Sequence, residues 1–320
     1  MMQFYKKRDF GTFITDSFAF FKLYGKNYFK NFLLLNGLLL ILMVVVIVFG
    51  YKEFFGAIFG SNISGQSYYF EQLFNDNLGV FIVSGILLFI LSTALITINL
   101  LFPVFYMKRI AEGNTHIKAD DILGDFRVNG KKVAATYFGL TFLVLPVATI
   151  IFGISYILIF IIIGLVLILF VGPNLFNIVS FLCYDYFNGK RSFFESLSYA
   201  VRSQFSYANG REKSPYWKYW GATLIMFILF YIVSIFFSSI PMIMFFIKLS
   251  TTAPDAQFER NPFVGSFGIL FFLIYGISSV ISTLLMNVLY INSGLMYYDS
   301  RTDLHQKVEL AEIDTIGINE

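Results

Sequence analysis

Apolar residues dominate six long stretches of this chain, and polar residues gather in the segments between them. The apolar stretches occupy residues 31–50, 78–107, 133–152, 154–185, 219–247 and 264–298. A helix rises about 1.5 Å per residue and the hydrocarbon core of a bilayer is about 30 Å thick, so each stretch can cross a membrane. The pattern predicts an all-α integral membrane protein with six transmembrane helices.

The third and fourth stretches are almost continuous. As a single helix, residues 133–185 would extend roughly 80 Å, far beyond the thickness of a bilayer. We therefore expect two spans joined by a very short turn. Glycine and serine favour turns, and this places the turn at Gly153-Ile154-Ser155.

Lysine and arginine are sorted between alternate connections. Of the 23 Lys and Arg residues, 20 lie in the N-terminal arm, in residues 107–132 and 186–218, and in the C-terminal tail. The other three are Lys52, Lys248 and Arg260. Basic residues stay on the cytoplasmic side during insertion, which predicts that both termini are cytoplasmic.

Each predicted hairpin follows a cytoplasmic segment with helical periodicity. In the arm, residues 1–30, apolar side chains recur at spacings of three and four from Phe10 to Tyr24. A second, weaker segment covers Asp120–Arg127, and a third covers 192–207. Such amphipathic helices suit the membrane interface. We interpret the chain as three parallel units, each an elbow helix plus a hairpin; the alternative is chance similarity among spans that share flanking rules.

Composition supports the membrane assignment. The chain is 57% hydrophobic and 13% charged, with a mean hydropathy of +0.72, whereas soluble domains carry about 25% charged residues. The longest polar stretch, 186–218, is too short to fold alone. The net charge of +3 belongs to the cytoplasmic face and does not indicate nucleic-acid binding. Residues 299–320 form an acidic cytoplasmic tail.

The order of elements resembles the glycerophosphoryl diester phosphodiesterase membrane-domain family, in particular its stand-alone bacterial relatives of six spans. The resemblance covers nearly the whole chain. It depends on the elbow at 192–207, on Trp217-Lys218-Tyr219-Trp220-Gly221, and on the run from Gly294 to Arg301. It implies this fold and a bacterial inner-membrane location. The family's catalytic domain has no counterpart in this sequence, so no activity is carried over.

Few residues could carry catalysis or hold a metal. His116 and His305 are the only histidines, and both fall in predicted cytoplasmic segments. A zinc site needs three or four converging ligands, and the loop carrying His116 offers only Asp120 and Asp121. The spans contain neither a histidine nor a pair of carboxylates. We therefore expect no enzyme, no metal and no cofactor.

Amide side chains are the main polar groups within the spans. The candidate intramembrane polar cluster consists of Asn99, Asn174, Asn177, Asn287 and Asn292, and Asn36 is a further amide in the first span. Amides in hydrocarbon need partners, so they should face the interior of the bundle. They either line a polar pocket between the even-numbered spans or fix helix packing through hydrogen bonds.

A second candidate group lies where spans meet the cytoplasmic headgroups. These predicted interfacial anchors are Trp217, Lys218, Trp220, Asp185, Asp299 and Arg301. For the two aspartates we expect ion pairs with Arg191, Arg202 or Arg301, which stabilise little at an exposed surface.

Two functions follow from these observations. The first is a non-enzymatic assembly, scaffold or accessory protein of the inner membrane that contacts lipid and other membrane proteins. The alternative is a transporter or lipid-handling protein that uses a polar pocket between the even-numbered spans.

Overall fold

The computed structural model describes residues 2–51, 78–207, 213–251, 263 and 265–305. Within this part every regular element is a helix. Six helical stretches in it are long and apolar enough to cross a membrane. They are Phe10–Gly50, Leu88–Ala111, Gly130–Ile161, Ile163–Asn188, Tyr216–Thr251 and Ser266–Ser300. The predictions of an all-α fold and of a multi-pass membrane protein are confirmed.

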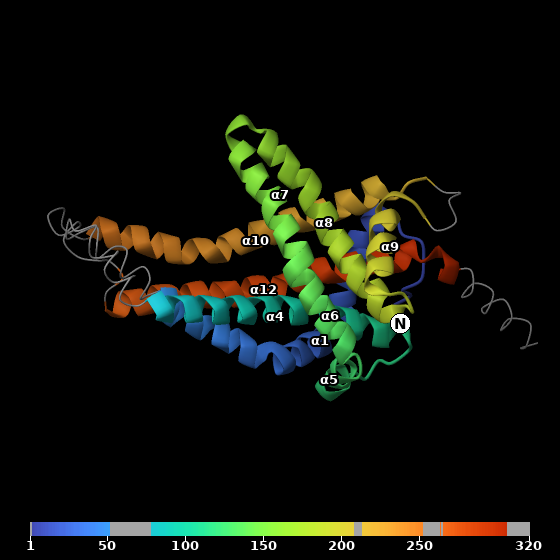
Figure 1. Cartoon of the computed structure of the whole chain (residues 1–320), viewed down its shortest axis with the longest axis horizontal. Helices are drawn as coiled ribbons and strands as arrows, with labels where there is room; N and C mark the ends of the chain where they lie inside the picture. The colour runs from blue at the N-terminus through green and yellow to red at the C-terminus, as the bar shows by residue number, and fades with distance from the viewer. Residues whose placement is uncertain (1, 52–77, 208–212, 252–262, 264, 306–320) are drawn as a thin grey trace, which may run out of the picture. The chain divides into compact units, whose positions relative to one another are not determined.

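The helices are coloured in chain order from blue to red in Figure 1. Their bounds are α1 Phe10–Val46, followed by the π-helix Ile47–Tyr51, α4 Leu78–Ala111, α5 Ala119–Val128, α6 Gly130–Gly139, followed by the π-helix Leu140–Val144, α7 Leu145–Ile157, followed by the 3₁₀ turn Leu158–Ile161, α8 Ile163–Asn188, α9 Phe193–Phe205, α10 Tyr216–Thr251 and α12 Ser266–Ser300. Residues 51–77 and 249–263 are the connections expected on the outer side, and most of them lies outside the described residues, as does most of the acidic tail.

Two of the three predicted elbow segments are separate helices. The segments expected at Asp120–Arg127 and 192–207 correspond to α5 and α9. The first elbow differs, because α1 runs from Phe10 to Val46 without a break. Residues 22–32 contain no proline, and Gly25 sits within the helix beside Phe21. The backbone hydrogen bonds therefore continue, since opening them would leave polar groups without partners.

The predicted turn between the third and fourth spans was placed wrongly. Gly153-Ile154-Ser155 lies within α7, and the chain reverses at Leu158–Ile162, where Ile162 has a left-handed backbone with φ 66°. Gly164 explains the position of the turn: a Cβ there would collide with the carbonyl of Ser155 and lie 2.6 Å from the carbonyl carbon of Leu158. Only glycine lets α8 begin so close to the end of α7, and the two helices then run side by side (Figure 1).

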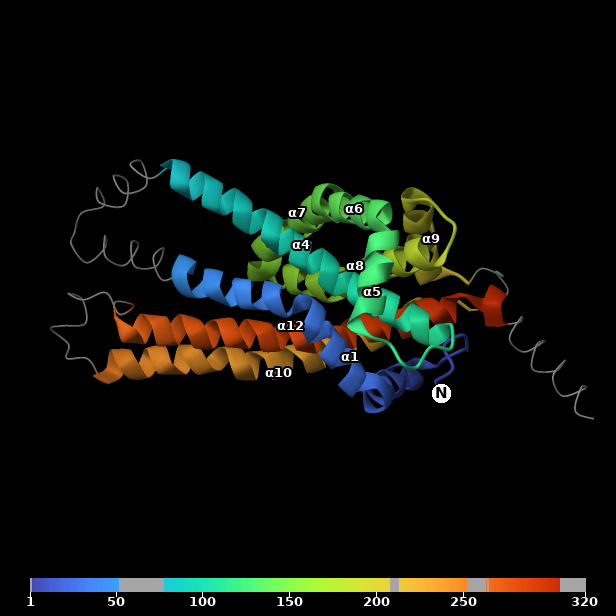
Figure 2. The same cartoon turned by 90° about the horizontal axis from the view of Figure 1, so that it is seen from below.

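The chain divides into two compact units. One consists of 36–95 and 230–286 and holds the later part of α1, the early part of α4, the later part of α10 and the early part of α12. In it α10 and α12 lie side by side (Figure 2). Ser278 Oγ donates a 3.1 Å hydrogen bond to the carbonyl of Phe237. Ile47, Val48, Phe263 and Phe272 form its buried apolar cluster.

The other unit, residues 1–35, 96–229 and 287–320, carries nearly all the charged groups described below. Aromatic rings join α1 to α4 in it: the Tyr28 ring lies 4.9 Å from that of Tyr106 and 5.1 Å from that of Phe102, both edge-on. Edge-to-face pairs of this kind add about 0.5–1.5 kcal/mol beyond their buried area. We call this part of the protein the charged unit.

Helices α4, α8 and α12 approach closely within the charged unit. Gly294 of α12 is the contact point, because a Cβ there would meet the hydroxyl of Tyr184 and lie 2.7 Å from the sulfur of Met107. The Tyr184 hydroxyl in turn donates to Met107 Sδ at 3.0 Å. The ends of α8 and α12 are also buried, and with them the carboxylates of Asp185 and Asp299.

Candidate functional site: buried carboxylates and a basic pocket

Asp299, the next-to-last residue of α12, accepts hydrogen bonds from four donors. Its Oδ1 accepts the backbone N–H of Arg8 at 2.6 Å. Its Oδ2 accepts Tyr219 Oη at 2.6 Å, Lys218 Nζ at 2.8 Å and Tyr207 Oη at 3.2 Å. The carboxylate is fully buried. It thereby joins the segment before α1, the segment after α9 and the start of α10 to the end of α12.

Asp185 has a comparable place near the end of α8. Its Oδ1 accepts Arg191 Nη1 at 2.6 Å and lies 3.7 Å from Arg301 Nη1. The aspartate side chain is fully buried, whereas that of Arg191 is 42% exposed. This pair therefore links a buried carboxylate to a cation that reaches solvent. Arg301 also forms an ion pair with Asp303 at 3.0 Å.

The aspartates confirm part of the sequence interpretation and correct part of it. Arg191 and Arg301 pair with Asp185 as expected, but Arg202 donates instead to Ser198 Oγ at 3.0 Å. The expected exposed surface is wrong for both carboxylates, because their side chains are fully buried. For Asp299 the physical reason is that the segment before α1 and the start of α10 pack over it. For the pair of Asp299 with Lys218, whose side chain is only 19% exposed, breaking the pair costs about 3–5 kcal/mol.

Arg8 is a buried residue that the sequence interpretation missed. Its side chain is fully buried, and its Nε forms a 2.9 Å ion pair with Asp16. Its other nitrogens donate to the carbonyls of Phe4 and Gln3, both at 2.7 Å. Burial lowers the pKa of this guanidinium, against the opposing effect of Asp16. Within the run Lys6-Lys7-Arg8 only the multidentate geometry of arginine hinted at this role.

The predicted intramembrane amides form hydrogen bonds with hydroxyl groups on neighbouring helices and not with one another. Asn287 Oδ1 accepts Tyr28 Oη at 2.6 Å. Asn292 Nδ2 donates to Ser17 Oγ at 3.0 Å, and Asn177 Oδ1 accepts Thr223 Oγ1 at 2.9 Å. These bonds join α1 to α12 and α8 to α10. Two members of the predicted cluster remain. Asn99 is buried. Asn174 Nδ2 donates to Tyr216 Oη at 3.0 Å.

The predicted anchors at the start of α10 take different roles. Trp217 is 65% exposed, as an interfacial residue would be. Trp220 Nε1 donates to the carbonyl of Leu169 at 3.1 Å, and its ring stacks on Phe170 at 4.9 Å. Lys218 points the other way, to Asp299 and the carbonyl of Arg8. Only the tryptophans remain candidates for headgroup anchors.

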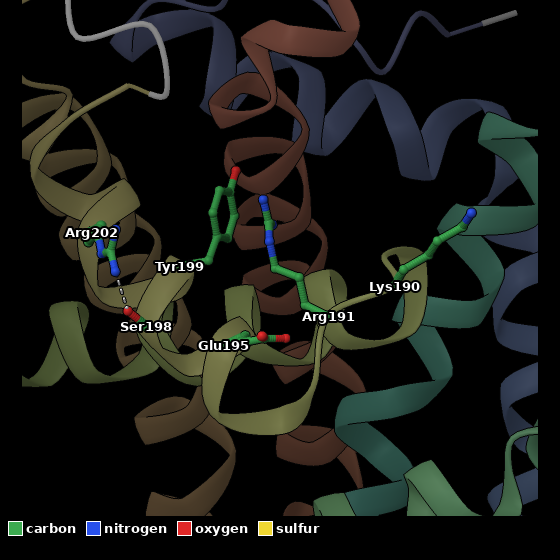
Figure 3. Close-up of a pocket in the computed structure, with 6 residues that line it drawn as sticks. All are labelled: Lys190, Arg191, Glu195, Ser198, Tyr199 and Arg202. Carbon is green, nitrogen blue, oxygen red and sulfur yellow. Dashed lines mark hydrogen bonds between the residues drawn. The ribbon is translucent and has the colours of Figure 1, made fainter.

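A basic pocket opens beside Arg191. It has a volume of about 460 Å³ and is lined by Lys190, Arg191, Glu195, Ser198, Tyr199 and Arg202 (Figure 3). All six come from the turn after α8 or from α9. Ser192 and Glu195 cap α9 reciprocally: the Ser192 N–H donates to Glu195 Oε2 at 2.8 Å, and the Glu195 N–H donates to Ser192 Oγ at 3.4 Å. Phe193 fixes the helix against α6, where its ring covers Gly139.

The histidines take no part in these groups. His305 has a ring nitrogen 2.9 Å from the carbonyl of Tyr298. The backbone N–H of His116 donates to Asn114 Oδ1 at 3.1 Å. Among the described residues, no three His, Cys, Asp or Glu side chains are grouped so as to hold a metal ion.

Comparison with known proteins identifies no relative of this chain. No family model, no curated protein and no solved structure matches the chain. The resemblance to the glycerophosphoryl diester phosphodiesterase membrane domain therefore stays a prediction, and the functional argument depends on the residues themselves.

Proposed function

We propose that this chain is a non-enzymatic, multi-pass protein of the bacterial inner membrane that serves as an assembly or scaffold component for other membrane proteins. One observation carries the proposal: the ionisable side chains gathered at the ends of α8 and α12 are engaged in joining helices. Asp299 is held by four donors and Asp185 by two arginines. Groups held in this way stabilise a frame and are poorly placed to turn over a substrate.

The third span supplies a lateral surface on which a partner could pack. Only 6% of the most apolar window of Gly130–Ile161 is buried, against 56% for Leu88–Ala111. Phe160 is 89% exposed and Tyr156 is 72% exposed. In a bilayer, such a helix is covered either by lipid or by another membrane protein. We assign it to a partner span, because its first part is held against α9 by the contact of Phe193 with Gly139.

Photo-crosslinking in native membranes tests this assignment. A benzophenone amino acid replaces Tyr156 in one variant and Trp217 in a second, which serves as a control at an exposed aromatic residue on another helix. We expect discrete protein adducts at position 156, identified by mass spectrometry. Adducts to lipid alone at both positions would count decisively against a scaffold.

The proposed topology has an independent test. With both termini cytoplasmic, cysteines introduced at Lys131 and Lys213 are expected to react with a membrane-impermeant maleimide only after the membrane is opened. The native Cys183 is buried and gives little background. Labelling of either position in intact spheroplasts contradicts the predicted orientation.

A transporter or lipid-handling protein is the second candidate, and one observation favours it. Asn177 Nδ2 and Asn292 Oδ1 are buried without a hydrogen-bond partner in the described part of the chain. Buried polar atoms without partners are costly, and water or a polar substrate would satisfy them. A cysteine at position 177 distinguishes the candidates: it reacts with a small charged thiosulfonate if a water-filled path reaches it, and stays unmodified in a closed scaffold.

A further inference from the structure

The pocket on α9 carries more positive than negative charge. Its lining includes Lys190, Arg191 and Arg202 but a single carboxylate, that of Glu195. That carboxylate is already bonded to the Ser192 N–H, which lowers the pKa of Glu195 and keeps it ionised. The formal charge of the lining is +2. An anion would therefore be attracted into the pocket.

The cations are only partly neutralised by the protein. Among the described residues, neither Lys190 nor Arg202 forms an ion pair with a carboxylate. Arg191 uses Nη1 on Asp185 and stacks its guanidinium on the Tyr199 ring at 4.4 Å. A guanidinium has five N–H donors, so Arg191 keeps donors for a ligand. Figure 3 shows Arg191 beside Tyr199, with Arg202 and Lys190 on opposite sides of them.

Two of the three cations are held in place before any ligand arrives. Asp185 and Tyr199 fix Arg191, and the 3.0 Å bond to Ser198 Oγ fixes Arg202. A side chain that is already ordered loses less conformational entropy on binding. Arginine forks also match the geometry of phosphate oxygens better than ammonium groups do. These features favour a phosphate group over a small halide ion.

The surface next to the pocket is apolar and largely exposed, although the Phe205 ring stacks on that of Tyr216. Phe194, Val201 and Phe205 follow one another at spacings of seven and four, so they share one face of α9. Their side chains are 71%, 40% and 55% exposed. The opposite face, with Ala200 and Gln204, is buried. Thus α9 presents an apolar stripe beside a cationic pocket, the arrangement expected where acyl chains meet headgroups.

We propose that the pocket lined by Lys190, Arg191 and Arg202 binds the phosphate group of an anionic phospholipid, with Phe194, Val201 and Phe205 against its acyl chains. This site goes beyond the proposed scaffold function and does not require it. A soluble phosphate ester shares the headgroup chemistry but lacks the acyl chains, so it would use the pocket and leave the stripe uncovered.

Native mass spectrometry of the full-length protein in detergent tests the site. The probes are dioctanoyl phosphatidylglycerol, dioctanoyl phosphatidylcholine and sn-glycerol 3-phosphate, each titrated separately. The test variant combines Lys190→Gln with Arg202→Gln. The control combines Lys131→Gln with Lys213→Gln, which removes the same charge from exposed positions outside the pocket.

We expect one phosphatidylglycerol to bind the wild type and the control alike, and phosphatidylcholine to bind more weakly. Each cation near the surface contributes about a fivefold gain in affinity, so the test variant should bind phosphatidylglycerol about thirtyfold more weakly. Binding of sn-glycerol 3-phosphate with the same dependence on Lys190 and Arg202 would uphold a phosphate site and assign it to a soluble ester.

Equal binding of the two lipids, or equal loss in the test variant and the control, would overturn the proposal. A folding defect is recognised separately, because Lys190 and Arg202 form no ion pair among the described residues and their replacement should leave the unfolding temperature of the lipid-free protein unchanged. If that temperature falls, the single variants Lys190→Gln and Arg202→Gln are titrated instead. A wild-type affinity in both singles would also contradict the site.

Discussion

Replacing Asp299 by asparagine tests whether this carboxylate holds the charged unit together. The Oδ2 atom faces three donors and Oδ1 faces one, the backbone N–H of Arg8. An amide oxygen can take the place of Oδ2, but the amide nitrogen then faces the N–H of Arg8. The variant therefore loses one charge-assisted hydrogen bond of 2.6 Å and leaves a buried donor without a partner.

The expected cost follows from these two losses. Hydrogen bonds to charged groups contribute about 1.5–3 kcal/mol, and breaking a buried ion pair costs about 3–5 kcal/mol. We expect Asp299→Asn to lower the free energy of unfolding by about 3–5 kcal/mol. The ion pair with Lys218 accounts for part of this, so the double variant with Lys218→Met should lose less than the two single variants summed.

The protein contains its own probe for this measurement. Trp217 and Trp220, its only tryptophans, flank Lys218 and Tyr219 at the start of α10. Their fluorescence, followed during unfolding in mixed detergent micelles, reports on the region around Asp299. The control is Asp303→Asn, because the Asp303 side chain is 51% exposed and its pair with Arg301 should contribute less than about 1 kcal/mol. A loss of less than about 0.5 kcal/mol for Asp299→Asn would refute the reasoning.

Three further predictions concern packing, pH and backbone strain. Gly294→Ala should cost about 1–3 kcal/mol, because the methyl group meets the Tyr184 hydroxyl; an unchanged denaturation midpoint would contradict this close approach. Glu195 accepts the Ser192 N–H, which lowers its pKa, so its stabilisation of α9 is present above about pH 4.3 and lost as pH falls through the lowered value. Hydrogen exchange of α9 should show this loss in the wild type but not in Glu195→Gln. Ile162→Gly should stabilise the protein by roughly 1 kcal/mol by relieving the left-handed backbone, a gain that thermal unfolding would detect.

The hydrophobic pattern determined the helical class and the number of spans. Both follow from local physics: a long apolar stretch in lipid must satisfy its backbone hydrogen bonds within one helix. The segment at 192–207 was recognised for a similar local reason, because its apolar side chains recur at helical spacing. The turn at Gly153 was placed wrongly, because glycine alone ends a helix only weakly, and the segment of the first predicted elbow continues into the first span as α1.

The tertiary structure decided which polar groups are buried and what they contact. Arg8 and Asp299 are 291 residues apart, and no spacing in the chain relates them. Likewise, Gly164 lets α8 approach Ser155 of α7 and so sets the position of the turn, and Gly294 lets α12 approach Tyr184 of α8. Such contacts depend on the shapes of several helices at once. The charged residues could therefore be recognised in the sequence, while their partners were fixed only by how the helices pack.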